Sequence, residues 1–142
     1  MPTPSPSAAV PTSSITATAN ATSWTRAEAL SHADAIKAGP DGALTQLSAL
    51  AVGSSLTAAR AALRDAAAAD AVAVTSLAAG LWPTSVRSLV NVYIAVLDSE
   101  RVEFDKLATD SSVAAMQSDA GQLSVVLTQV QAAETGLINA LS

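Results

Sequence analysis

The 142-residue sequence contains no cysteine and a single histidine. The absence of cysteine excludes disulfides, thiolate metal sites and a cysteine nucleophile. Charged residues make up only 13% of the chain, against a usual share of about 25%. Basic residues are particularly scarce, 7 against 12 acidic ones, which gives a net charge of −5. Nucleic acids and anionic lipid surfaces are therefore poor partners, because both are bound by basic faces.

The motifs of common catalytic sites are also missing. The sequence has no phosphate-binding loop, no Gly-x-Ser-x-Gly elbow and no Asp-rich calcium loop. No stretch reaches the roughly 18 uncharged apolar residues of a membrane span, and the first residues lack the basic and apolar regions of a signal peptide. We therefore expect a protein that is not an enzyme, uses no cofactor or metal, and does not itself insert into a membrane.

Hydrophobic residues make up 50% of the chain and aromatic residues only 3%. A core built mainly from Ala, Leu and Val favours closely packed helices over a sheet, because Ala is the strongest helix former. Residues 1–23 differ, since they hold four of the six prolines, no charge, and mostly Ser, Thr and Ala. We interpret 1–23 as a disordered, flexible tether and 24–142 as a helical domain. An ordinary disordered tail is the alternative for 1–23.

Apolar residues recur with helical spacing over 25–52, 55–80, 83–108 and 111–141. Thr25 and Glu28 have the spacing of a capping box at the start of the first helix. The matched lengths and short connections predict an all-α fold, an up-down antiparallel four-helix bundle. Gly39-Pro40 is expected to kink the first helix. In the alternative fold, 43–80 form one long helix and 25–38 a separate lid.

The stretch Gly80-Leu81-Trp82-Pro83 is predicted to be the corner between the second and third helices. Gly80 is expected to end one helix in the left-handed conformation, and Pro83 to begin the next. Because Trp24 begins the first helix, the fold places Trp24 and Trp82 at the same end. The plainer interpretation is that they plug this end, and the functional one is an anchor for a partner or an apolar ligand.

Three of the predicted apolar stripes contain an acid, namely Asp70, Glu100 and Glu134. Counting the rise per residue spreads these acids along the axis, so that they form neither a metal site nor a carboxylate pair. The same count predicts ion pairs between the helices: Asp70 with Lys37, Glu100 with Arg64, and Glu134 with Arg87 and His32. If the protein has a binding site, we expect it at the corner, with these anchor residues: Trp24, Trp82, Glu134, Arg87 and His32.

The favoured hypothesis is a non-enzymatic, extracytoplasmic helical domain with a structural or protein-interaction role. The features are similar to helical ectodomains of actinobacterial lipoproteins, although the lipidated cysteine of such proteins is absent, and two Lys against five Arg are typical of an actinobacterial coding bias. One alternative is a bundle that binds a small molecule or lipid at the Trp24/Trp82 end. Another is a subunit of a larger homo-assembly (a phage, filament or shell component) with the tail ordered on a neighbour.

Overall fold

The computed structural model describes residues 22–49 and 55–142, and within these ranges the chain is helical, without strands. The elements are α2 (Arg26–Ser48), α3 (Leu56–Ala79), the short 3₁₀ helix η2 (Thr84–Val86), α4 (Arg87–Ala108), α5 (Val113–Asp119) and α6 (Gly121–Leu141). The prediction of an all-α protein is confirmed. The tether predicted for 1–23 lies almost entirely outside the described residues.

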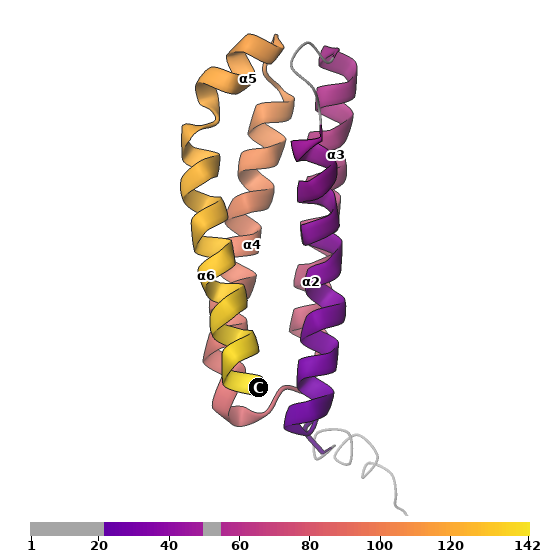
Figure 1. The fold of residues 1–142 in the computed structure, drawn as a ribbon, viewed down its shortest axis with the longest axis vertical. Helices are drawn as coiled ribbons and strands as arrows, with labels where there is room; N and C mark the ends of the chain where they lie inside the picture. The colour runs from indigo at the N-terminus through magenta and orange to yellow at the C-terminus, as the bar shows by residue number, and fades with distance from the viewer. Residues whose placement is uncertain (1–21, 50–54) are drawn as a thin grey trace, which may run out of the picture.

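The four long helices lie side by side along the length of the molecule (Figure 1). Helix α3 contacts α2 and α4, and α6 contacts α4 and α2. The connection between α3 and α4 lies at one end together with the C-terminus, which we call the corner end, and α5 lies at the other end. Because α2 and α3 are separate helices in contact with each other, the alternative of one helix over 43–80 is wrong.

Side chains at the helix starts satisfy the first free backbone N–H groups. The predicted capping box of α2 is present, since Glu28 N donates to Thr25 Oγ1 at 3.1 Å and Thr25 N donates to Glu28 Oε2 at 2.7 Å. Pro40 lies inside α2, which continues to Ser48, so Gly39-Pro40 does not end the helix. The kink expected there stays a prediction.

The last predicted segment, 111–141, consists of two helices. Ala120 ends α5 and is also the first flanking residue of α6. Gly121 follows directly, and glycine has a helix propensity about 1 kcal/mol worse than alanine. Glycine therefore weakens the helix at the interruption, although Gly136 lies within α6 without interrupting it.

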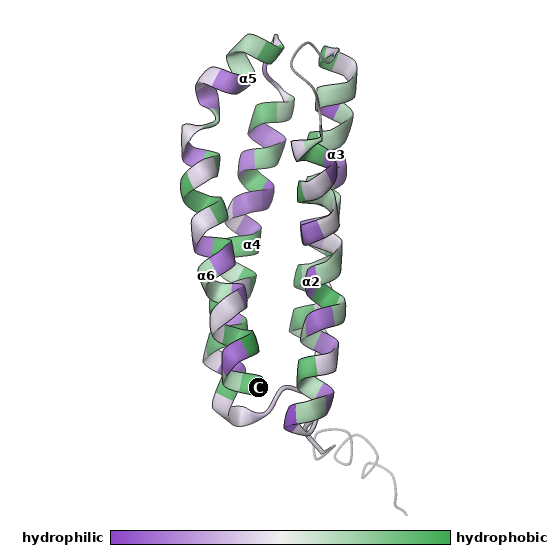
Figure 2. Ribbon diagram, viewed as in Figure 1, coloured by the Kyte–Doolittle hydropathy of each residue, from purple (hydrophilic) through white to green (hydrophobic). Residues whose placement is uncertain are grey.

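Two apolar clusters fill the interior. The cluster nearer the corner end includes Leu77, Trp82, Tyr93, Leu97 and Leu137. The cluster nearer α5 includes Leu63, Phe104, Leu107, Met116 and Leu123. Both consist largely of residues from the predicted stripes, although Figure 2 shows hydrophilic residues interleaved with hydrophobic ones along the long helices. On α3 and α4, the buried residues between the two clusters are acids, namely Asp70, Glu100 and Glu103.

Gly80 makes the corner possible through its small size. Its backbone is extended (φ −74°, ψ 153°), so the predicted left-handed conformation is wrong. The indole Nε1 of Trp82 donates to the carbonyl oxygen of Leu77 at 2.7 Å, which folds the ring over the end of α3. A Cβ on Gly80 would overlap the Trp82 ring and lie 2.9 Å from Cη2 of Trp24. The position therefore requires glycine because two indoles occupy the space of a side chain.

Gly80→Ala is expected to lower the free energy of unfolding by about 1–3 kcal/mol, because the added methyl group must displace packed rings. Gly42→Ala is the matched control, since a Cβ at this exposed position of α2 meets no atom within 4 Å. It should raise stability by about 0.5–1 kcal/mol through helix propensity. Urea denaturation measures both effects. A Gly80→Ala protein as stable as the wild type would contradict the steric explanation.

Candidate functional site

An aromatic cluster covers the corner end. The rings of Trp24 and Trp82 meet edge to face, with centroids 4.9 Å apart, and His32 stacks on Trp24 at 3.8 Å. The backbone N–H of Trp24 also donates to the carbonyl oxygen of Leu81 at 2.7 Å, which holds the start of the described chain against the corner. Three of the five predicted anchor residues are thus brought together.

The other two predicted anchors are placed differently. Arg87 belongs to the corner, because its Nε donates to the carbonyl oxygen of Trp82 at 3.1 Å. Glu134 instead lies with Tyr93 and Lys37, in the interior of the helix assembly. The predicted pairing of Glu134 with Arg87 and His32 is therefore wrong.

A surface groove runs along α2 and α3 from the aromatic cluster. It has a volume of about 440 Å³. Its lining is mostly apolar and consists of Trp24, His32, Ala35, Ile36, Gly39, Pro40, Ala69, Val72, Ala73 and Ser76. Trp82, which is only 4% exposed, is not part of the lining. A ligand at the corner would therefore contact Trp24 and the apolar groove. Trp82 lies buried behind Trp24 and closes the end of the helix assembly.

A second groove, of about 360 Å³, lies between α4 and α6. We call its lining the α4/α6 face: Leu89, Val92, Val96, Gln129, Ala132, Ala133 and Gly136. No charged residue belongs to this face, and Val92 is 52% exposed. Along the whole of α6 the single charged residue is Glu134, which is turned toward the other helices. This part of the surface is therefore both apolar and free of charge.

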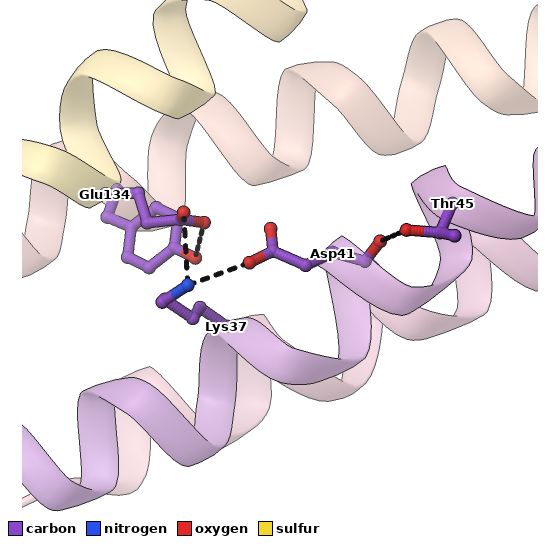
Figure 3. Close-up of polar contacts among 5 residues, drawn as sticks. Lys37, Asp41, Thr45 and Glu134 are labelled. Atoms are coloured by element: carbon purple, nitrogen blue, oxygen red, sulfur yellow. Dashed lines mark hydrogen bonds and ion pairs between the residues drawn. The ribbon is translucent and has the colours of Figure 1, made fainter. Parts of the chain in front are cut away.

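Helices α2, α4 and α6 contribute to a partly buried polar network, in which the side chains of Lys37, Asp41 and Glu134 are 32%, 42% and 17% exposed. Lys37 Nζ lies 3.0 Å from Asp41 Oδ2 and 3.8 Å from Glu134 Oε1 (Figure 3). The Tyr93 hydroxyl donates to Glu134 Oε2 at 3.1 Å. Lys37 thus pairs with Asp41 and Glu134, and its predicted pairing with Asp70 is wrong.

Burial and neighbouring charges shift the pKa values of this network. Burial, together with the nearby charge of Asp41, raises the pKa of the Glu134 carboxyl above its usual range. Burial raises the pKa of Tyr93 as well, so its hydroxyl stays a hydrogen-bond donor. The hydrogen bond and charge of Asp41 raise the pKa of Lys37, which keeps this amine protonated. The network therefore holds one fixed cation between two acids.

Asp70 and Glu100 form a separate pair, on α3 and α4. Their exposed fractions are 1% and 0%. Among the described residues, no N–H or side-chain hydroxyl donates to either carboxyl. The two groups act on each other instead, and burial is the main reason that the pKa of both is raised, that of Asp70 to about 9. The predicted partner of Glu100, Arg64, is exposed, and the prediction that no carboxylate pair forms is wrong.

The direction of the side chains explains this error. Asp70 lies nine residues before the end of α3 at Ala79, and Glu100 lies 13 residues after the start of α4 at Arg87. The difference of four residues corresponds to roughly 6 Å along the helices. Side chains lean toward the N-terminus of their helix, and α4 runs back along α3. The two carboxyls therefore lean toward each other and close the gap.

Sequence reasoning missed two members of the polar network. Nothing in the sequence distinguishes a Tyr93 hydroxyl that meets Glu134 from one that reaches water. Asp41 directly follows Gly39-Pro40, where a kink is expected, and this draws attention away from its side chain. Its spacing of four from Lys37 is the signal that could have found it, because residues four apart are neighbours on a helix.

In the described part of the chain, no group of three or more His, Asp or Glu side chains could hold a metal ion. None of the described helices combines the length and the apolar character needed to cross a membrane. Comparison with known proteins gave no match to a family model, a curated protein or a solved structure. Any function must therefore be argued from the surfaces and buried groups themselves.

Lys37→Met is expected to lower the free energy of unfolding by roughly 1–2 kcal/mol, because it leaves Glu134 and Asp41 without their cation in a partly buried place. Arg101→Met is the control, since the side chains of Arg101 and its partner Asp98 on the same helix are 37% and 47% exposed. That change should cost less than about 0.5 kcal/mol. Thermal or urea unfolding at neutral pH compares them. Equal losses would show that the Lys37 network has no special role.

Proposed function

We propose that this chain is a non-enzymatic, extracytoplasmic helical domain that acts by binding protein, and that the α4/α6 face binds a second copy of the chain. The observation that carries the proposal is the absence of charge from an apolar, grooved face. On this face the side chain of Val92 is 52% exposed. A partner would remove this apolar area from water, which is favourable.

Charge supports a second copy as the partner. Each chain carries a net charge of −5, so two copies repel each other unless they meet through an uncharged surface. The α4/α6 face is such a surface, and Ala132, Ala133 and Gly136 leave room for the side chains of an incoming helix. The same helix carries its one charge, Glu134, away from the contact.

The size of the face predicts a weak association. Two neighbouring helices of about 30 Å, with axes about 10 Å apart, present on the order of 600 Å². A standard stable interface buries about 800 Å² on each partner. We therefore expect a dimer that forms at high protein concentration and dissociates on dilution.

The proposed architecture is an up-down antiparallel four-helix bundle of α2, α3, α4 and α6, with a kink near Gly39-Pro40 and α5 as an extra turn at one end. The ring of contacts among the four long helices supports it. The uncharged Pro/Ser/Thr composition of residues 1–23 supports a tether that presents the domain outside the cytoplasm.

Val92→Lys should shift the full-length chain toward the monomer, because it places two positive charges in the apolar contact of a symmetric dimer. Sedimentation velocity over a wide concentration range measures this shift. Val72→Lys is the matched control, since Val72 is 67% exposed on α3 and lies outside the α4/α6 face. A wild-type chain that stays monomeric at every concentration would overturn self-association.

A second candidate function is binding of a small apolar molecule in the groove of α2 and α3. The groove volume of about 440 Å³ favours it, because ligand sites commonly measure about 300–1,000 Å³. The stacked Trp24 and His32 rings at its end offer a flat surface for an aromatic or acyl group. Its openness to solvent favours weak binding.

The same two variants test this candidate with the roles reversed. Nile red, an uncharged apolar dye, is expected to bind the wild type and to accept excitation energy from Trp24. Val72→Lys should weaken dye binding at least tenfold, since it puts a charge in the lining, whereas Val92→Lys should leave it unchanged. Dye binding lost in Val92→Lys but kept in Val72→Lys would assign the dye to the α4/α6 face instead.

A further inference from the structure

The pair of Asp70 and Glu100 lies at the boundary between the two apolar clusters. Buried residues about one helical turn away on α3 and α4 are Ala66, Ala67, Ala73, Leu97, Glu103 and Phe104. Of these only Glu103 has a polar side chain, and its carboxylate pairs with Lys106 at 3.1 Å. Four carboxyl oxygens are thus enclosed without a donor among the described residues, although a buried polar group without a hydrogen bond costs several kcal/mol.

The charged groups nearest to the pair already have other partners. On α4, Arg101 attracts Asp70 electrostatically, but its guanidinium lies 3.4 Å from Asp98. On α2, Asp41 repels Glu100 and is itself bound to Lys37. Asp41 on α2 therefore disfavours a second negative charge on the pair. Arg101 attracts Asp70 but donates no hydrogen bond to it.

We propose that Asp70 and Glu100 bind one proton between them, and that this proton holds α3 against α4. The Asp70 carboxyl carries the proton and donates it to a Glu100 oxygen, which gives each group a partner. Loss of the proton to water leaves two negative charges in an apolar boundary. The charges then repel each other, and hydrating them requires α3 and α4 to separate. The ligand of this site is a proton, and its binding or loss determines whether α3 and α4 stay in contact.

A metal ion fits the pair less well than a proton does. Calcium takes six to eight oxygen ligands, and magnesium keeps several waters in an octahedral shell. The pair supplies two carboxyls, and among the described residues no third His, Asp or Glu side chain joins them in a group that could hold a metal ion. A proton needs only one donor and one acceptor, which the two carboxyls provide.

The direction of the pH dependence follows from the raised pKa values. In the unfolded chain both carboxyls titrate near pH 4, whereas the pKa of Asp70 in the folded chain is about 9. Between these values the folded state binds more protons than the unfolded state. Stability is therefore greatest in mild acid and falls as the pH rises toward 9. Glu134 acts in the same direction, so variants must separate its contribution from that of the pair.

The test is urea unfolding of the full-length chain between pH 5 and pH 9. The wild-type unfolding constant should rise by up to tenfold per pH unit for one released proton. Asp70→Asn with Glu100→Gln removes both titrating groups at nearly constant shape, and this double variant should lose most of that rise. Asp65→Asn, an exposed acid on the same helix, should keep it. A double variant with the wild-type pH dependence would overturn the proposal.

Infrared spectroscopy of the folded wild type keeps the proposal testable if the double variant does not fold. The carbonyl stretch of a protonated carboxylic acid should be present in the wild type at pH 7. It should be absent from Asp70→Asn, which removes the carboxyl that carries the proton and offers an amide N–H to Glu100 in its place. Its absence from the wild type would overturn the proposal.

A second experiment compares the stability of the protein in sodium, potassium, magnesium and calcium chlorides at pH 8 and equal ionic strength. One of these cations could stabilise the wild type and the Asp65→Asn control but not Asp70→Asn. That result would assign the pair to a metal ion and overturn the proposal.

Discussion

The contact between Asp70 and Glu100 is the interaction on which the arrangement of the helices depends. Apolar side chains alone allow an alanine-rich helix to slide along its neighbour, because one alanine is replaced by another one turn away. Two buried carboxyls do not allow this. Moving α3 by one turn would separate the two carboxyls and leave each buried group without the partner that it has here. The pair therefore fixes the register of α3 and α4 at the cost of some stability, a known use of buried polar groups.

The polar network of α2 and α6 fixes the remaining two helices by the same principle. Lys37 is long enough to reach Glu134 across the interior, and Tyr93 brings a hydroxyl from α4 to the same carboxylate. Each long helix thus contributes at least one ionisable side chain to a contact with another helix. At the corner end the helices are held by steric packing, since the indole rings of Trp24 and Trp82 occupy the space beside Gly80.

Much of the fold could be predicted because helical periodicity depends on nearest neighbours along the chain. The stripe through Leu63, Ala66 and Leu77 is buried as expected, and the cap at Thr25 is present. The pairing of charges could not be predicted in this way. It depends on differences of a few ångströms between helices and on the lean of each side chain, as the meeting of Asp70 with Glu100 shows. The need for glycine at position 80 depends on where Trp24 and Trp82 rest, which no local pattern contains.

Several of the few charged side chains in this protein lie in the interior, and one part of the surface carries none. Ionisable groups are few, yet Asp70, Glu100 and Glu134 are turned inward, whereas the outer side of α6 carries none. A soluble helix normally places its charges outside, since that keeps copies apart. Here the register of the helices is set by charges inside, which leaves the α4/α6 face free to be apolar. The same few charges therefore hold the helices in register and, by their absence from one face, leave that face apolar.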